Sequence, residues 1–244
     1  WRRVLAAYPV RDPASTTAFS GPRGAAAAPL HSPLWRHGCG RTPTQPIPYT
    51  DGMETTRCPW PADDALMLAY HDTEWGVPLH DDRGLFEYLV LDAAQAGLSW
   101  RAVLHKRDGY RQAFHHFDLA KVADFGSGHV DRLMQDSGII RNRRKIEGAI
   151  RGAQLALGLQ QEFGSLDAYF WRFTEGRTIV NHWSEVAQVP ATSPESEAMA
   201  KDLKRRGFTF CGPTICYAFM QAAGMINDHL TGCFRHAEVA TATR

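Results

Sequence analysis

Residues 133–146 read Leu-Met-Gln-Asp-Ser-Gly-Ile-Ile-Arg-Asn-Arg-Arg-Lys-Ile, a pattern that predicts two helices joined by a tight turn. Gly138 permits the turn, and the second helix is expected to begin near Asn142, because asparagine is favoured at helix N-termini. The unpaired backbone N–H groups at such a helix start attract phosphate. The basic side chains around this point are Arg141, Arg143, Arg144 and Lys145. The segment therefore predicts either a sequence-independent grip on one nucleic-acid phosphate or a solvated basic helix face.

The chain after Asp63 is patterned almost entirely as helices. One helix is expected to follow Asp81–Asp82 as its cap and to end at Gly97, with its apolar stripe at Leu85, Phe86, Leu89, Val90 and Ala93. The other clear helices are expected around Ile146 to Leu157 with a stop at Phe163–Gly164, over Pro194–Arg206 before Gly207, and over Thr214–Ala223 before Gly224. The alternating segments Thr178–Val180 and Phe208–Cys211 are too short to build a sheet, so the expected fold class is all-α.

The composition is typical of a soluble protein and excludes several classes. The 244 residues are 44% hydrophobic and 22% charged. The sequence contains no run of eighteen apolar residues, so no membrane-spanning helix is predicted. A net charge of +1 excludes a strongly basic, histone-like binder. Five thinly spread cysteines do not form a disulfide scaffold, which favours a reducing compartment such as the cytoplasm.

The first 52 residues differ from the rest of the chain. They hold eight of the fourteen prolines and six arginines against two aspartates, with no sustained hydrophobic period. We expect residues 1–52 to be a disordered or non-native N-terminal extension before Met53, with an organelle transit peptide as the alternative. The folded domain is expected over residues 53–236, and residues 237–244 are expected to form a flexible tail.

Two cysteine–histidine pairs lie at opposite ends of this domain. Cys58 and His71 are near its start, and His229 and Cys233 are near its end. Two cysteines and two histidines form a common closed zinc site, which would tie the two ends together. Each pair alone is more often a core or surface feature. Cys211 and Cys216 lie in an apolar stretch and are expected in the core.

Aromatic residues gather near an isolated carboxylate. The aromatic residues are Trp60, Tyr70, Trp75 and Trp100. Asp92 lies in the apolar helix that follows Asp81–Asp82, and burial there would raise its pKa. The spacing equally allows an exposed Asp92 and aromatic rings that only fill the core.

Several motifs occur in an order that resembles DNA-3-methyladenine glycosylase I, a bacterial base-excision repair family within the helix-hairpin-helix glycosylases. The resemblance covers about residues 57 to 235. The motifs are Arg-Cys-Pro-Trp (57–60), Ala-Tyr-His-Asp-Thr-Glu-Trp-Gly-Val-Pro (69–78), Gln-Ala-Gly-Leu-Ser-Trp (95–100), Gly-Ile-Ile-Arg (138–141), Arg-Gly-Phe (206–208), Gly-Pro-Thr-Ile-Cys-Tyr (212–217) and Asn-Asp-His (227–229).

The resemblance implies a helix-hairpin-helix DNA glycosylase fold whose structural zinc joins the N- and C-terminal parts of the domain. The implied zinc ligands are Cys58, His71, His229 and Cys233. The implied base pocket consists of Trp60, Tyr70 and Trp100, with Trp75 close by. Leu98, in the segment 95–98, is the implied wedge that enters the duplex. The hairpin 137–141 would anchor a phosphate, with Gly138, Arg141 and Arg143 as the expected DNA contacts.

The implied reaction is hydrolysis of the N-glycosidic bond of 3-methyladenine after base flipping in alkylated double-stranded DNA. Asp92 and Tyr70 are the expected catalytic residues, and the protein is expected to act as a cytoplasmic monomer without a membrane. Two positions depart from the family, since Asp92 stands where glutamate is usual and Met67 where a second tyrosine is usual. These departures bear on lesion preference and rate.

Two other functions are compatible with parts of the pattern. A zinc and helix-hairpin-helix DNA-binding module, without catalysis or with altered specificity, is the main alternative, and the departures at Asp92 and Met67 favour it. A zinc deaminase, suggested by His71 and Glu74, is excluded because these two residues are three positions apart rather than two, and because the chain lacks the Cys-x-x-Cys spacing of that class.

Overall fold

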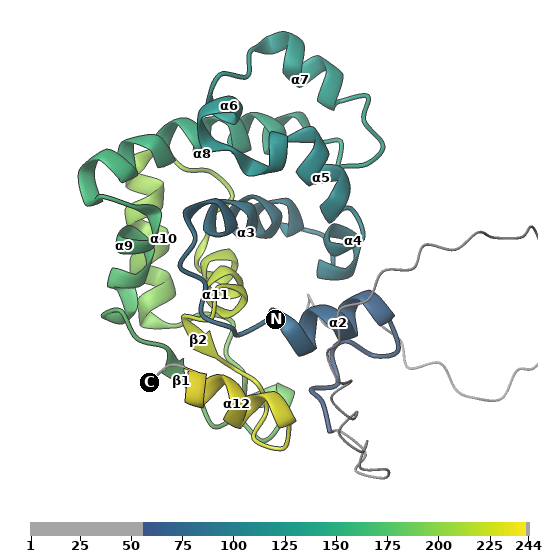
Figure 1. The fold of residues 1–244 in the computed structure, drawn as a ribbon, viewed down its shortest axis with the longest axis vertical. Coiled ribbons are helices and arrows are strands. Elements are labelled where there is room, and N and C mark those ends of the chain that lie inside the picture. Colours follow the sequence, from purple (N-terminus) through teal and green to yellow (C-terminus); the bar gives the residue numbers. More distant parts are fainter. Residues whose placement is uncertain (1–55, 243–244) are drawn as a thin grey trace, which may run out of the picture. The chain divides into compact units, whose positions relative to one another are not determined.

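The computed structural model describes residues 56–242, drawn as ribbon in Figure 1. The expectations for residues 1–52 lie outside the described part of the chain. Its α-helices are α2 (Ala65–Thr73), α3 (Asp82–Gln95), α4 (Trp100–Leu104), α5 (Arg107–Ala113), α6 (Leu119–Ala123), α7 (Ser127–Leu133), α8 (Arg143–Phe163), α9 (Leu166–Trp171), α10 (Pro194–Arg206), α11 (Pro213–Ala222) and α12 (Phe234–Ala242). Three short 3-10 helices are η1 (His115–Phe117), η2 (Arg172–Thr174) and η3 (Val186–Gln188). Within the described residues, no helix is long and apolar enough to cross a membrane.

Helix α3 lies at the centre of the described fold, between α8 and α11 (Figure 1). Asp81 caps its N-terminus by accepting a hydrogen bond from the backbone of Gly84, and Gly97 adopts a positive φ of 78° just after its end. Ten of its residues are buried, which is what its central position requires. The predicted bounds of this helix are confirmed.

The other predicted helix boundaries follow the same local chemistry. Asn142 caps α8 through its side chain, and Gly164 terminates that helix with a positive φ. Pro194 opens α10 and Gly207 ends it, as predicted. Helix α11 ends within one residue of the predicted position, and Gly224 follows it with a φ of 71°.

A two-residue parallel ladder is the one β element of the described chain. Strand β1 (Ile179–Val180) pairs with β2 (Ile226–Asn227), with Ile179 opposite Ile226. The ladder fixes the segment before α12 without adding a sheet layer. The described fold is therefore mostly helical, with this ladder as a small departure from the all-α expectation.

The prediction of a flexible tail over residues 237–244 is wrong for residues 237–242, which belong to a helix. Helix α12 continues to Ala242, and Val239 is only 1% exposed. His236 bonds through its ring to the backbone of Asn181, and its carbonyl accepts from the Asn227 side chain. These contacts and the buried valine hold the segment against the domain, and local sequence spacing gave no sign of them.

The predicted hairpin connects α7 to α8 and rests on α5. The Gly138 N–H donates to Asp136 Oδ1 at 2.7 Å. A Cβ on Gly109 in α5 would overlap the Gly138 carbonyl, so the two backbones touch. Tyr110 adds a hydroxyl that accepts from the backbone N–H of Ile140. Gly138 therefore serves close backbone packing, and its φ is not positive.

Candidate functional site

A cavity of about 410 Å³ opens among α2, α3, α4 and α11. It is lined by every aromatic residue predicted for the base pocket, and by Met67 and Asp92. Those aromatic residues are Trp60, Tyr70, Trp75 and Trp100. The predicted residues, although far apart in sequence, are therefore brought together around one space large enough for a small organic ligand.

The aromatic rings form an angled wall. The Tyr70 and Trp100 ring centroids are 5.2 Å apart with their planes tilted by 46°. Trp60 meets Trp75 edge to face at 5.1 Å and lies 6.3 Å from Tyr70. Burial foremost, and then Tyr88 and Asp92, raise the pKa of Tyr70, so its phenol stays neutral at physiological pH. Such a wall offers faces and edges to a flat aromatic ligand.

Asp92 projects from the last turns of α3 toward this cavity and is 2% exposed. Its Oδ2 atom has no hydrogen-bond partner in the described chain. Burial alone raises the pKa of this carboxyl well above its usual range. The exposed alternative for Asp92 is therefore wrong, and burial favours the neutral form of its carboxyl.

Unpaired polar atoms concentrate around the same cavity. Within residues 56–242, five buried side-chain polar atoms lack a hydrogen-bond partner, and four of them belong to residues that line it. The four are the Nε1 donors of Trp60 and Trp100, and the acceptors Asp92 Oδ2 and Gln221 Oε1. Because buried polar groups are normally paired, this set indicates a site built for a polar ligand.

Gln221 is a cavity residue that the sequence interpretation missed. Its Nε2 donates to Asp228 Oδ2 at 2.5 Å, which fixes the amide with Oε1 unpaired. Asp228 is held in turn by donors from Tyr217, Asn181 and Trp183. The available signal was a single amide inside the otherwise apolar helix 214–223. The same helix contributes Thr214, Ile215 and Ala218 to the cavity wall.

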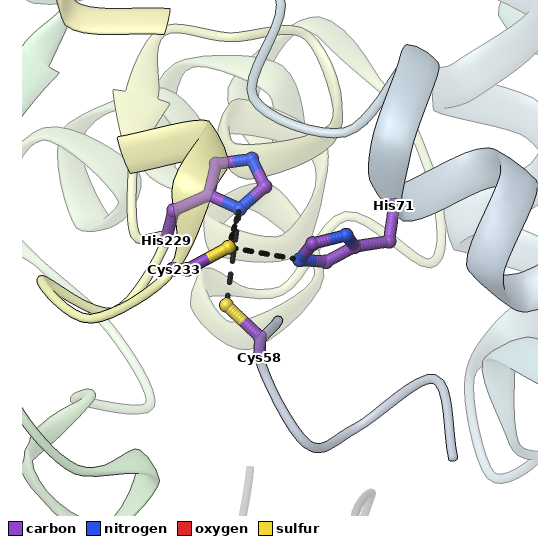
Figure 2. Close-up of side chains that lie close together, drawn as sticks. All are labelled: Cys58, His71, His229 and Cys233. Carbon is purple, nitrogen blue, oxygen red and sulfur yellow. Dashed lines mark hydrogen bonds between the residues drawn. The ribbon is translucent and has the colours of Figure 1, made fainter. Parts of the chain in front are cut away.

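The four predicted metal ligands meet at one point, shown in Figure 2. Cys58, His71, His229 and Cys233 are all buried, and their ligand atoms lie within 4.8 Å of one another. Cys233 Sγ is 3.5 Å from His71 Nε2 and 3.6 Å from His229 Nδ1, and Cys58 Sγ is 3.8 Å from His229 Nδ1. Tetrahedral zinc bonds would separate sulfur and nitrogen ligands by about 3.6 Å. The donor set and spacing therefore fit a metal ion.

The second nitrogen of each histidine has its own partner. His71 Nδ1 donates to Asp72 Oδ1 at 2.8 Å, and His229 Nε2 donates to the Trp75 carbonyl at 2.9 Å. Such contacts fix the tautomer and present the other nitrogen to a metal. Hydrogen bonding from Cys58, and then from the two histidines, lowers the pKa of Cys233, which favours a thiolate. The hydrogen bonds around the four residues therefore also favour metal binding.

The cluster of four metal ligands adjoins the cavity through helix α2 and through Trp75. Tyr70 and His71 are neighbours on α2, so one faces the cavity and the other the metal ligands. The Trp75 ring contacts the His229 ring edge to face at 4.6 Å. The cluster therefore fixes part of the aromatic wall without lining the cavity itself.

The predicted DNA-contacting residues lie outside the cavity wall. Leu98 is 39% exposed and follows Gly97, which lines the cavity. Arg141 is exposed at the hairpin, and Arg143 forms an ion pair with Asp131 at 2.6 Å. Lys145 does not add to the exposed charge, because its Nζ donates to two backbone carbonyls. Asn142 caps the Lys145 N–H, leaving the first N–H groups of α8 without partners in the described chain.

Comparison with known proteins gives consistent results. The sequence model for methyladenine glycosylase matches residues 60–236. The DNA-3-methyladenine glycosylase 1 of Escherichia coli K12 is 46% identical over 177 residues, which are 72% of this chain and 95% of that protein. A crystal structure of a 3-methyladenine DNA glycosylase I superposes with a TM-score of 0.72 at 47% identity, covering 73% of this chain and 98% of the other. A Staphylococcus aureus 3-methyladenine DNA glycosylase I, solved for 3-methyladenine recognition, gives a TM-score of 0.71 at 34% identity, over 73% and 95% of the two chains.

Proposed function

The chain belongs to the methyladenine glycosylase family, and on that premise we propose how its cavity releases a damaged base. It is a glycosylase that hydrolyses the N-glycosyl bond of 3-methyladenine in DNA. Water adds to the sugar carbon and loses one proton to solvent as the bond to the base breaks, so the sugar gains a hydroxyl group and the base takes the bonding electrons. Because methylation at N3 makes the attached adenine cationic, the base leaves as a neutral molecule and needs little acid catalysis.

The four unpaired polar atoms in an aromatic cavity are the observation that carries this proposal. An alkylated base must leave the duplex stack before an enzyme can enclose it. In the cavity, Tyr70 and Trp100 border one face of the base, with Trp60 and Trp75 completing the wall. Aromatic faces attract a cationic base more strongly than a neutral one.

Asp92 acts on the charge of the base. The empty cavity keeps its carboxyl neutral by burial, whereas a cationic base favours the carboxylate and gives it a hydrogen-bond donor in the exocyclic amine. Tyr70, whose phenol stays neutral, is the second residue proposed to touch the base. A normal adenine carries no charge to ionise Asp92, so the carboxyl favours the lesion.

The DNA is engaged from outside the cavity. The exposed Leu98 supports a wedge that fills the gap left by the flipped base. Gly138, Arg141 and Arg143 are the proposed phosphate contacts, supported by the backbone N–H groups at the start of α8 that have no partner in the described chain. The proposed partner is double-stranded alkylated DNA, bound by a cytoplasmic monomer.

Cys58, His71, His229 and Cys233 are proposed to hold one structural Zn²⁺. Bound there, the ion would supply folding stability by joining the segment before α2 to the segment before α12. Four protein ligands leave no open position for a reacting water, so the chemistry belongs to the cavity.

The test is base release from alkylated DNA, with the products identified by chromatography. The wild-type protein is expected to release 3-methyladenine, and Asp92→Asn to release it at least about tenfold more slowly, because asparagine cannot ionise to pair with the cationic base and each pKa unit of that interaction corresponds to about 1.4 kcal/mol. Asp124→Asn, an exposed carboxylate change, is the matched control. Wild-type release by Asp92→Asn would overturn the role of Asp92, and DNA binding without any release by the wild type would favour a non-catalytic module.

A further inference from the structure

Lys145 differs from its basic neighbours because its side chain is directed into the protein. Its Nζ donates to the carbonyl oxygens of Ala94 and Ala96, each at 2.7 Å. Burial of the side chain lowers the pKa of Lys145. Arg144, the preceding residue, is exposed and has no ion pair in the described chain. Lys145 is therefore committed to an internal contact rather than to an external anion.

The two carbonyls lie where α3 ends. Helix C-termini leave their last carbonyls unpaired, and a cation there is favoured by the helix dipole. Ala96 leaves the helix with φ −48° and ψ 114°, and Gly97 follows with φ 78°. The Leu98 N–H donates back to the Gln95 carbonyl at 2.6 Å. Residues 95–98 thus form a tight turn. Lys145 holds the backbone at the start of that turn through its hydrogen bonds to Ala94 and Ala96.

This turn borders both the cavity and the exposed wedge. Gln95, Ala96 and Gly97 line the cavity, and Leu98 extends to the surface. Lys145 belongs to the first turn of α8, directly after the hairpin. One side chain therefore joins the hairpin helix to the wall and wedge of the base pocket.

We propose that Lys145 is a positioning residue that couples phosphate docking at the hairpin to insertion of the 95–98 turn. It sets the position of the turn relative to α8, so that a hairpin seated on the DNA backbone places Leu98 in the duplex as the base enters the cavity. The inference rests on the proposed function. A displacement of about 1 Å in a positioning group can cost on the order of a hundredfold in rate, so loss of both hydrogen bonds should be measurable.

The test compares Lys145→Met, which keeps the length of the side chain, with Arg144→Met, which removes the neighbouring charge. Release of 3-methyladenine from methylated duplex DNA gives kcat and KM. A duplex carrying a stable abasic analogue opposite 2-aminopurine reports wedge insertion by fluorescence and affinity by titration at several salt concentrations. Binding of free 3-methyladenine, followed by tryptophan fluorescence, reports whether the pocket is intact.

Lys145→Met is expected to lower kcat by about tenfold or more and to reduce the 2-aminopurine signal at saturating protein. Its affinity for free 3-methyladenine should stay within about twofold of wild type, and its salt dependence should be unchanged. Arg144→Met removes an exposed charge next to the proposed phosphate contact Arg143, and it should instead lower the slope of log affinity against log salt by up to about 1. Lys145→Arg, which keeps donors, is expected to recover most of kcat.

Combination with Leu98→Ala keeps the proposal testable if Lys145→Met is destabilised. If Lys145 acts through the wedge, Lys145→Met should cost much less in the Leu98→Ala background than in wild type. Additive losses, or a salt slope that Lys145→Met lowers by about 1, would overturn the proposal. Failure of the proposed function would look different, because the wild-type protein itself would then release no base.

Discussion

Replacement of Asp92 by asparagine should stabilise the free protein in a pH-dependent manner while it impairs base release. The carboxyl is 2% exposed, has an unpaired oxygen, and has its pKa raised by burial alone. In the unfolded chain the same carboxyl ionises near pH 4. Between that pH and the raised folded pKa, the folded state holds one proton more than the unfolded state. Wild-type stability therefore falls as pH rises through this window.

The magnitude follows from this linkage. One proton of difference changes the free energy of unfolding by about 1.4 kcal/mol per pH unit. Asparagine has no ionisable group, so it removes this dependence and retains only the cost of an unpaired buried polar group, about 1–3 kcal/mol, which protonated aspartate shares. Asp92→Asn and wild type should therefore be similar near pH 4. The variant should gain stability relative to wild type as the pH rises from about 4 toward the raised pKa of the folded state.

Urea unfolding followed by tryptophan fluorescence at pH 5, 6, 7 and 8, with equal added metal, measures this difference. Asp124→Asn, at an exposed position on the end of α6, is the matched control for the loss of one carboxylate. A pH-independent difference for Asp92→Asn would mean that Asp92 is hydrated or ionised in the folded protein. The reasoning from burial would then be refuted.

Three further predictions follow from other contacts. Cys233→Ser should remove the bound metal and lower the free energy of unfolding by several kcal/mol, as measured by elemental analysis and urea unfolding; one metal ion retained per chain would contradict the proposed ligation. Gly109→Ala should cost about 1–3 kcal/mol because its methyl group would overlap the Gly138 carbonyl, whereas Gly158→Ala, with open space at its Cβ, should be neutral or stabilising in thermal melts. Leu98→Ala should slow base release from duplex DNA without weakening the binding of free 3-methyladenine, and equal losses in both assays would exclude a wedge role.

The boundaries of α3, α8, α10 and α11 were predictable because they depend on local chemistry. Asp81 and Asn142 cap helices through their own side chains, within three residues of the groups that they satisfy. Gly97 and Gly207 end helices through a backbone conformation that other residues rarely adopt. Such signals need no knowledge of the tertiary fold, so spacing alone located these elements closely.

The contacts that shape the site were not predictable in this way. Helical spacing left Asp92 open between a buried and an exposed position, and only packing against α11 and α8 decides it. Lys145 appears in the sequence as one of several basic residues, yet its partners lie about fifty positions earlier in the chain. The buried side of α12 likewise depends on contacts with the segment around Asn181. The resemblance to a known family identified the pocket residues. The structure adds the contacts of each residue and the polar atoms that have no hydrogen-bond partner in the described chain.

The unpaired atoms of the cavity explain how it can favour a cationic base over a neutral one. Asp92 Oδ2, Gln221 Oε1 and the two indole N–H groups have no hydrogen-bond partner among the described protein groups, and all four residues line the cavity. A neutral base can supply hydrogen bonds to these four groups, but it carries no positive charge that would stabilise the ionised form of Asp92. A cationic base can supply the hydrogen bonds and also favour the ionised carboxylate. Each pKa unit by which it lowers the pKa of Asp92 adds about 1.4 kcal/mol to its binding free energy relative to a neutral base. Because burial is the single cause of the raised pKa of Asp92, a cationic ligand would supply the charge that its carboxylate needs, which agrees with the proposed role of this residue in favouring the alkylated base.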